Sequence, residues 1–294
     1  MIMKRLFYCF CAVLAVMMSA SPSWAKLDVV ASFSILGDMV EQVAGDKATV
    51  TTIVGPDADA HLYQPNTGDA VAVAEADLVI INGMGFETWS AQLIETSGTK
   101  AAVAVATDGI TPLLVDGEVD PHAWNSLENG LVYVNNIEAA LSAASPADAA
   151  TFRANADAYR AKLNALHNRA LADIAKLPEQ KRVVVTAHDA FGYLETAYGL
   201  TFLAPQGIDT EAEPSAKELA GLISFLKDTG AGALFVENIA NGDLIAQISR
   251  ETGITIGGRI YSDALSVKGT PATSYLAMFT HNLDLLTKTL AAAR

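Results

Sequence analysis

Cysteine is nearly absent from this chain of 294 residues, in which only Cys9 and Cys11 occur. Both lie in a leader-like segment, where two basic residues precede an apolar run that gives way to small residues before Ala25. This pattern predicts a Sec-type signal peptide over residues 1–25, cleaved after Ala25. The exported chain would then have no cysteine, which excludes disulfide scaffolds, zinc-thiolate fingers and cysteine nucleophiles.

The position of the two cysteines also bears on localisation. Both sit too early in the leader, and among the wrong neighbours, for the cleavage site of a lipoprotein. We therefore expect a periplasmic protein that is secreted by its signal peptide and is not a lipoprotein.

Basic residues and long apolar runs are also scarce. The chain has 19 Lys and Arg against 33 Asp and Glu, and its formal charge of −14 becomes −16 once Lys4 and Arg5 are removed with the leader. Such a surface would repel the phosphates of a nucleic acid, so no nucleic-acid partner is expected. No apolar run after Ala25 approaches the roughly 18 residues that a membrane span needs. These absences leave an exported, soluble protein of about two domains.

The sequence does contain an alternation of short β-branched runs and helical patterns, which predicts parallel sheets in α/β layers. The expected strands are residues 27–33, 49–54, 78–82, 101–106, 182–186, 200–203, 233–236 and 254–260. The expected helices are residues 35–44, 67–75, 87–96, 190–198, 215–229, 242–252 and 271–293.

One segment interrupts this alternation. Residues 146–177 contain no glycine and no proline after the first position, and their apolar side chains recur at helical spacing. The stripe consists of Phe152, Tyr159, Leu163, Leu166, Ala170, Ile174 and Leu177. A helix of this length would measure roughly 45–50 Å, enough to cross a whole molecule. We therefore expect two similar α/β lobes, residues 26–145 and 178–294, joined by one long rigid helix; one large domain with a surface helix is the alternative.

Histidine occurs only five times, and three of the five follow expected strands. His61, His122 and His188 lie in loops after such strands, whereas His167 and His281 lie inside expected helices. Ligands of open α/β sheets bind beyond the carboxyl ends of the strands. We therefore expect the first three histidines to form a site and the other two to be ordinary helix residues.

Asp263 has the same topological position, after the strand that ends near residue 260. With the three histidines it makes a set of three imidazoles and one carboxylate, which suits a divalent transition metal such as Zn²⁺. Successive members are 61, 66 and 75 residues apart, so the set contains no local metal motif. Scattered polar loop residues are the alternative interpretation of these positions.

Acidic residues near the expected ligands have two interpretations each. Those near His61 and His122 would either attract cations or form a solvated rim; they are Asp57, Asp59, Asp116, Glu118 and Asp120. Asp189, directly after His188, would either cap the following helix or orient the histidine, and capping is the simpler interpretation.

The segments around these residues resemble the zinc and manganese solute-binding proteins of ABC transporters (cluster A-I, ZnuA/TroA-like). The resemblance is carried by residues 56–65 (PDADAHLYQP), 120–124 (DPHAW), 186–193 (TAHDAFGY), 213–219 (EPSAKEL) and 261–265 (YSDAL). It covers essentially the whole mature chain and implies two lobes bridged by a rigid helix. It also implies a metal in the interlobe cleft, held by His61 and His122 from the first lobe and by His188 and Asp263 from the second.

The resemblance bears on the choice of metal as well. Members with histidine at the third ligand position favour zinc, and those with glutamate there favour manganese, in line with the preference of Mn²⁺ for oxygen. Zinc-uptake members often carry a long histidine-rich loop before the second ligand, but residues 107–121 are short and contain no histidine. In this respect the chain is similar to the short-loop AztC-type zinc-binding proteins.

The expected function is therefore that of a monomeric, non-enzymatic periplasmic protein. It would capture Zn²⁺, with Mn²⁺ or ferrous iron as the alternative, and deliver it to an ABC permease, with a periplasmic metallochaperone as an optional loading partner. The competing interpretation is an exported zinc hydrolase, in which Asp263, Glu211 or Glu237 would act as the base. A fourth protein ligand, however, would leave no open position for a reacting water. A third interpretation is an adhesin or metal buffer that serves no transporter.

Overall fold

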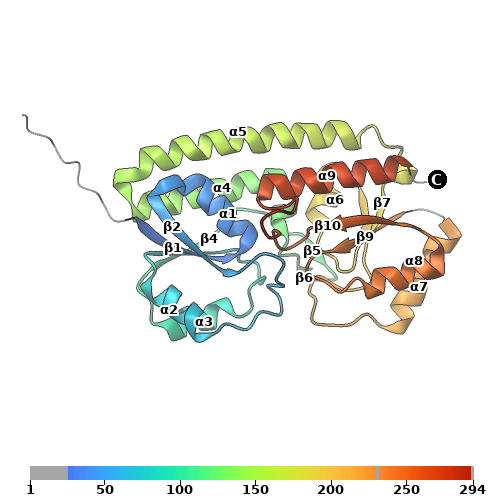
Figure 1. Cartoon of the computed structure of the whole chain (residues 1–294), viewed down its shortest axis with the longest axis horizontal. Coiled ribbons are helices and arrows are strands. Elements are labelled where there is room, and N and C mark those ends of the chain that lie inside the picture. The colour runs from blue at the N-terminus through green and yellow to red at the C-terminus, as the bar shows by residue number, and fades with distance from the viewer. Residues whose placement is uncertain (1–25, 230–231, 293–294) are drawn as a thin grey trace, which may run out of the picture.

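The computed structural model describes residues 26–229 and 232–292, so the expected signal peptide lies outside the described residues. Two four-stranded sheets lie side by side, and long helices run along one side of both (Figure 1). We call the sheet nearer the N-terminus with its helices the first lobe, and the other sheet with its helices the second lobe. The expected α/β fold with two parallel-sheet lobes is confirmed.

The first lobe has the strand order β2-β1-β3-β4, and all its strands pair in parallel. Its strands are β1 (Leu27–Phe33), β2 (Ala48–Val54), β3 (Leu78–Ile81) and β4 (Ala102–Val105). Its helices are α1 (Ser34–Ala44), α2 (Thr67–Glu75) and α3 (Ser90–Ser97). Because the strands are parallel, their carboxyl ends meet at one edge of the sheet.

The second lobe repeats the parallel arrangement with the strand order β10-β9-β7-β8. Its strands are β7 (Val183–Val185), β8 (Thr201–Leu203), β9 (Ala233–Glu237) and β10 (Ile256–Ile260). Its helices are α6 (Gly192–Tyr198), α7 (Ala216–Thr229) and α8 (Asp243–Thr252). In both lobes the strands and helices begin and end within a few residues of the expected positions.

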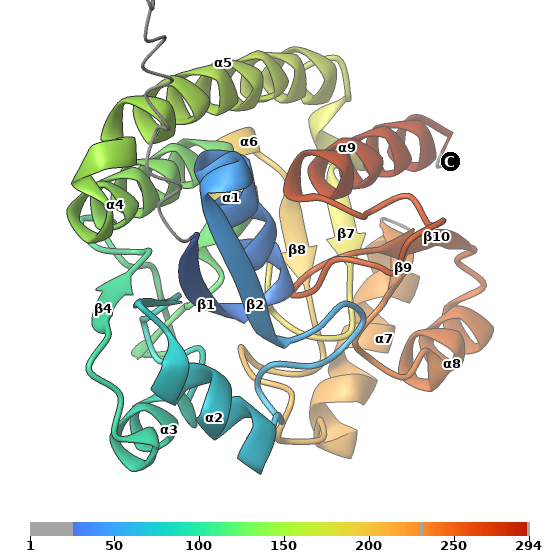
Figure 2. The ribbon, with the colours of Figure 1, turned by 60° about the vertical axis from the view of Figure 1, so that its left-hand side comes forward.

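Three helices form a layer that contacts both lobes: α4 (Leu127–Ala144), α5 (Ala149–Ile174) and α9 (Tyr275–Ala292) (Figure 2). With 26 residues, α5 is about 39 Å long. It is shorter than the expected helix at both ends, because residues 146–148 form a separate 3-10 turn and the helix ends at Ile174. All seven side chains of the expected apolar stripe are buried. They pack where α5 meets α1, α4, α6 and α9, which belong to different parts of the chain.

Two elements were not expected from the sequence, namely α4 and a short hairpin of β5 (Leu114–Val115) and β6 (Glu118–Val119). The helical pattern of α4 is weakened by Gly130 and three asparagines, which are poor helix formers. The structure requires that glycine, since a Cβ at Gly130 would lie 2.9 Å from the hydroxyl oxygen of Tyr275.

One continuous hydrophobic core runs through the helical layer and into both lobes, from Phe33 in the first to Phe191 in the second. A smaller separate cluster lies between the second sheet and helices α7 and α8. Because interiors are close-packed, a large rotation of one lobe against the other would expose part of the shared core. None of the helices in the described residues is long and apolar enough to span a bilayer.

Candidate metal centre

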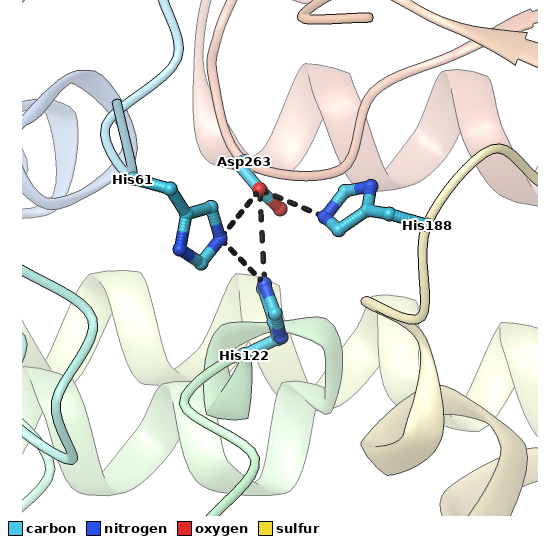
Figure 3. A group of neighbouring side chains, drawn as sticks. All are labelled: His61, His122, His188 and Asp263. Atoms are coloured by element: carbon cyan, nitrogen blue, oxygen red, sulfur yellow. Dashed lines mark hydrogen bonds and ion pairs between the residues drawn. The ribbon is translucent and has the colours of Figure 1, made fainter. Parts of the chain in front are cut away.

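The structure brings all four expected ligand residues together, at the facing edges of the two sheets (Figure 3). His61 follows β2, His188 follows β7 and Asp263 follows β10, whereas His122 comes after β4 and the short β5–β6 hairpin. Three of the four residues therefore lie directly beyond the carboxyl end of a parallel strand. The placement of the two lobes edge to edge turns four separate loops into one site.

The four ligand atoms are spaced for a single small ion. Nε2 of His61 lies 3.2 Å from Nε2 of His122. Oδ2 of Asp263 lies 3.1 Å from Nε2 of His188, 3.4 Å from that of His61 and 3.7 Å from that of His122. Tetrahedral zinc with bonds of 2.0–2.1 Å would hold its ligand atoms about 3.3 Å apart. These four separations bracket this value, and all four atoms lie within 4.8 Å of one another.

The site is buried, and its charges are strongly coupled. His61 is 7% exposed, while the other three residues are at most 1% exposed. Burial alone would lower the pKa of His122, but Asp263 and Asp120 raise that pKa to about 9. Burial likewise opposes a charge on His188, yet Glu237 and Asp263 raise its pKa well above the usual value. These protons balance the carboxylates in the metal-free protein, and a metal cation would replace them.

Asp263 is the negative partner in this balance. Burial would raise the pKa of its carboxyl, but the charges of His188 and His122 hold that pKa well below its usual range. Its Oδ2 faces the three imidazoles, whereas its Oδ1 is buried without a hydrogen-bond partner. The carboxylate therefore stays ionised and presents at least one free oxygen to the site.

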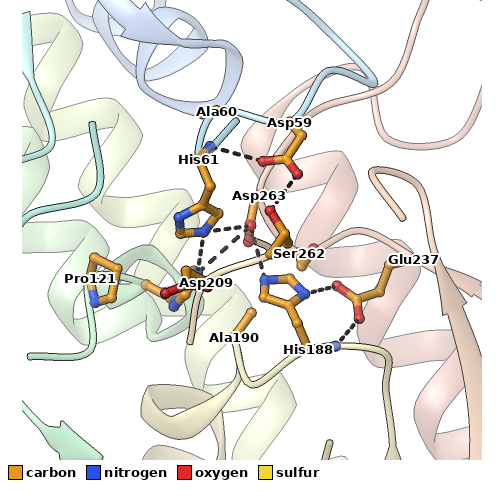
Figure 4. A network of polar contacts seen from close by, with 12 residues as sticks. Asp59, Ala60, His61, Pro121, His188, Ala190, Asp209, Glu237, Ser262 and Asp263 are labelled. Atoms are coloured by element: carbon orange, nitrogen blue, oxygen red, sulfur yellow. Dashed lines mark hydrogen bonds and ion pairs between the residues drawn. The ribbon is translucent and has the colours of Figure 1, made fainter. Parts of the chain in front are cut away.

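Two further carboxylates, Asp120 and Glu237, hold the imidazoles from behind, and Figure 4 shows Glu237 beside His188. Oδ1 of Asp120 lies 2.8 Å from Nδ1 of His122, and Oε2 of Glu237 lies 2.7 Å from Nδ1 of His188. Oε1 of Glu237 also accepts the backbone N–H groups of Ala187 and His188. Such contacts direct Nε2 toward the metal and raise the basicity of the ring.

Sequence reasoning missed both of these roles. The sequence interpretation of Asp120 was limited to attracting cations or forming a solvated rim, although its position two residues before His122 is a local signal. Glu237 ends β9, and only the pairing of β9 with β7 places it beside His188. Because that pairing joins residues about 50 positions apart, no local sequence signal marks this role.

Both interpretations of Asp189 are wrong. Helix α6 begins at Gly192, and its N-cap residue is Phe191, with no side-chain cap. The backbone N–H of Asp189 instead donates to the carbonyl of Gly207 at 3.0 Å, and Glu237 takes the place beside the His188 ring.

The two remaining histidines lie outside the site, as expected. His167 on α5 contacts the hydroxyl of Tyr198 at 3.1 Å. His281 on α9 contacts the backbone carbonyl of Arg259 at 3.0 Å. Both therefore serve the packing of their helices.

The ligand loops are tied to each other across the lobes. The indole N–H of Trp124, two residues after His122, donates to the carbonyl of Ser262 at 2.8 Å. The amide of Asn125 donates to the carbonyl of Ala190, also at 2.8 Å. Because both bonds are buried and join first-lobe to second-lobe segments, they fix the base of the site.

A family model for the periplasmic component A of the zinc-uptake complex (ZnuA) matches residues 29–289. This chain belongs to that family. The membership fits the site, because the family is defined by metal uptake and the matched range includes all four residues of the cluster.

Curated relatives match over most of their length. The manganese-binding lipoprotein MntA of Halalkalibacterium halodurans is 33% identical, over 88% of this chain and 86% of MntA. The iron-binding protein YfeA of Yersinia pestis is 34% identical, over 90% of this chain and 86% of YfeA. The metal ABC transporter substrate-binding lipoprotein SsaB of Streptococcus sanguinis is 33% identical, over 93% of this chain and 92% of SsaB.

A solved structure agrees with the fold. The periplasmic zinc-binding protein TroA of Treponema pallidum superimposes with a TM-score of 0.87 at 29% identity, covering 92% of this chain and 100% of TroA. The protein is therefore a metal-binding substrate-binding protein of an ABC transporter and not an enzyme. The site agrees, since Glu237 is engaged by His188 and Asp263 lies within the ligand cluster, so neither is available as a hydrolytic base.

The relatives correct one expectation. The sequence had predicted a periplasmic protein that is not a lipoprotein, yet MntA and SsaB are both named lipoproteins. The expectation rested on Cys9 and Cys11, which lie outside the described residues. It judged the two cysteines by their position in the leader and by their neighbours, and that local signal is overruled by relatives that match nearly the whole chain.

Proposed function

We propose that this protein captures one Zn²⁺ ion through His61, His122, His188 and Asp263, and that it presents the ion, as a monomer, to the permease of its ABC transporter. The observation that carries the proposal is the buried cluster of three imidazole nitrogens and one carboxylate oxygen, separated by 3.1–3.7 Å where contacts are defined. A nitrogen-rich site of low coordination number favours Zn²⁺, whereas Mn²⁺ prefers more oxygen.

The supporting carboxylates strengthen the same proposal. Asp120 and Glu237 hold two of the three rings in the orientation that a metal needs before any metal arrives. A site that is preorganised in this way loses little conformational entropy on binding, which favours tight capture of a scarce ion.

Manganese or ferrous iron is the second candidate, and one feature of the site favours it. Oδ1 of Asp263 is buried without a hydrogen-bond partner, so both oxygens of this carboxylate are available to an ion. Bidentate binding would give five ligand atoms, two of them oxygen, which suits Mn²⁺ or Fe²⁺ better than tetrahedral coordination does. The names of MntA and YfeA point in the same direction.

The ligand set is tested by calorimetric titration of zinc into the wild type and His188→Ala. We expect one ion per wild-type chain and a loss of more than about 100-fold in affinity for the variant, beyond the usual effect of losing a supporting residue. His281→Ala is the matched control, because it removes an imidazole that lies outside the cluster and contacts Arg259 and Tyr261, and it should titrate like the wild type. Equal affinity of His188→Ala and the wild type would overturn the ligand set.

The choice of metal is tested separately, by offering equal concentrations of zinc and manganese to the metal-free protein and measuring the bound metal. Zinc should occupy the site almost completely, since it exceeds Mn²⁺ in the general affinity order for nitrogen ligands. A site filled with manganese would replace zinc by the second candidate and leave the ligand set intact.

A further inference from the structure

The loop that carries His61, residues 55–66, reaches across the cleft; we call it the His61 loop. Oδ1 of Asp59 accepts the backbone N–H of His61 at 2.9 Å (Figure 4). Its Oδ2 accepts the hydroxyl of Thr210, in the second lobe, at 2.6 Å. One carboxylate therefore holds a ligand residue with one oxygen and the opposite lobe with the other.

Thr210 lies in a segment that is tied to the loop of His188. The backbone N–H of Gln206 donates to the carbonyl of Ala187, and that of Asp189 donates to the carbonyl of Gly207. These two bonds enclose His188 in the sequence. The contact between Asp59 and Thr210 consequently connects the loops of two ligands that come from different lobes.

Asp57 makes a second crossing from the same loop. Its backbone N–H donates to the carbonyl of Leu265 at 2.8 Å, and its Oδ2 accepts the N–H of Val267 at 3.3 Å. Its Oδ1 accepts the side-chain amide of Asn238 at 3.0 Å. Asp57 has a φ of 56°, in the left-handed region that few residues other than glycine adopt. The loop thus takes a disfavoured turn at the point where it contacts the segment of Asp263.

The position of His61 depends on the hydrogen bonds of its loop, whereas the rings of His122 and His188 are held directly by carboxylates. It is the most exposed of the three at 7%. In the described part of the chain no carboxylate contacts its Nδ1, whereas Asp120 and Glu237 hold the rings of His122 and His188. The position of the His61 ring is therefore set by its loop.

We propose that Asp59 and Thr210 are a positioning pair, which keeps His61 on the metal and whose opening limits the rate of metal release. This inference rests on the proposed function, in which His61 is a ligand. Separation of the part-buried hydrogen bond between Asp59 and Thr210 releases the part of the loop next to His61 while the bonds of Asp57 stay in place, whereas rotation of the lobes would break the shared core. The loop is the lower-energy route by which the ion leaves.

The inference also gives the acidic neighbours of His61 a function other than attracting cations. Both oxygens of Asp59 and both oxygens of Asp57 accept hydrogen bonds, three of the four from groups of the second lobe. These carboxylates hold the loop in place across the cleft, so the sequence interpretation as either an attractor or a solvated rim is incomplete for both.

The test is the rate at which the full-length zinc-loaded protein loses its ion to excess chelator, measured by stopped flow in Thr210→Val. This variant removes the hydroxyl and keeps the shape of the side chain. We expect loss about tenfold faster, with one ion still bound per chain, because a hydrogen bond to a charged group is removed. Thr210→Ser, which restores the hydroxyl, should release zinc at the wild-type rate. Thr51→Val, on an exposed position of β2, is the matched control and should do the same.

The His61→Ala variant, which lacks the ligand side chain, separates a positioning role of Thr210 from a general structural effect. If Thr210 acts through His61, Thr210→Val adds no further acceleration to His61→Ala. A persisting acceleration in that background, or a wild-type rate for Thr210→Val alone, would overturn the positioning pair while zinc binding stands. A wild-type protein that binds no zinc would overturn the proposed function, and the inference with it.

Discussion

Two ligand segments of this protein share one local motif and use it differently. In Asp59-Ala60-His61 and in Asp120-Pro121-His122, the aspartate accepts the backbone N–H of the histidine two residues later, at 2.9 Å in both. From there the two carboxylates diverge. Asp120 also contacts the ring of its own histidine, whereas Asp59 turns its second oxygen to Thr210 across the cleft.

The difference follows from where the two segments are packed. The His122 segment lies fully buried at the base of the site, where the indole of Trp124 and the amide of Asn125 fasten it to the second lobe. The His61 segment lies at the more exposed side and is fastened by hydrogen bonds of partly exposed groups. If both histidines bind the metal as proposed, the same three-residue motif gives one fixed ligand and one that can move. A transport protein needs both, because it must bind tightly and still release.

The largest expected effect concerns pH and the buried segment. The pKa of His122 is raised to about 9, so this ring is protonated in the metal-free protein at pH 7 and must lose its proton to bind metal. Zinc affinity should consequently rise with pH, about tenfold per unit well below pH 9 and about 50-fold between pH 7 and 9 for this one proton. The raised pKa of His188 steepens the rise, while Asp263, with its lowered pKa, stays ionised throughout.

A chelator competition series from pH 6 to 9.5 measures this dependence. An ordinary histidine, with a pKa of about 6.5, would lose its metal only near that pH. The structure moves it upward because carboxylates surround the rings. A zinc affinity that does not change above pH 7 would show that the rings of His122 and His188 are neutral without metal. The two segments would then not differ in the charge of their histidines.

The next effect comes from making the same substitution in both segments. Asp120→Asn should lower zinc affinity by about 10- to 100-fold, because the ring of His122 loses the charged group that orients it. Asp59→Asn should lower it by no more than about threefold, because its side chain does not touch the ring of His61 and an amide still bonds to a hydroxyl. Equal losses in the two variants, by calorimetry, would mean that the segments do not differ as described. Asp116→Asn, in the turn of the β5–β6 hairpin, is the control for removal of a nearby charge and should bind like the wild type.

The sequence contains enough information for the architecture and for the four residues of the cluster, and physical reasons explain why. Period-two and period-3.6 patterns are local, so strands and helices could be placed from residues that lie next to each other. His61, His122, His188 and Asp263 could be chosen because each follows a strand, and parallel strands gather their ends at one edge. Even α4 carries a buried stripe, but Gly130, which Tyr275 of α9 packs against, weakens the local pattern.

The supporting groups could not be found in the same way, since they depend on contacts between distant segments. Glu237 reaches His188 only because β9 lies beside β7, and Thr210 reaches Asp59 only because the lobes face each other. The pKa of His122 likewise depends on Asp263, which is 141 positions away in sequence and 3.7 Å away in space. The positions of the four cluster residues thus follow from topology, which sequence patterns reveal. The groups that orient these residues and shift their pKa values follow from packing, which sequence patterns do not reveal.

The smallest expected effect tests the buried segment through a neighbour that is neither ligand nor acid. A Cβ at Gly192, the first residue of α6, would lie 2.8 Å from Oδ2 of Asp120. Gly192→Ala should therefore push this carboxylate against the ring of His122 and lower zinc affinity about threefold, below the effect of removing the carboxylate. Overpacking should also reduce the free energy of unfolding by about 1–2 kcal/mol in chemical denaturation.

Gly221→Ala on exposed α7, where a Cβ has open space, is the matched control and should stabilise the protein by about 0.5–1 kcal/mol. In an Asp120→Ala background the clash is gone, so the cost of Gly192→Ala should disappear; a cost that remains would show that Gly192 serves the helix and not the carboxylate.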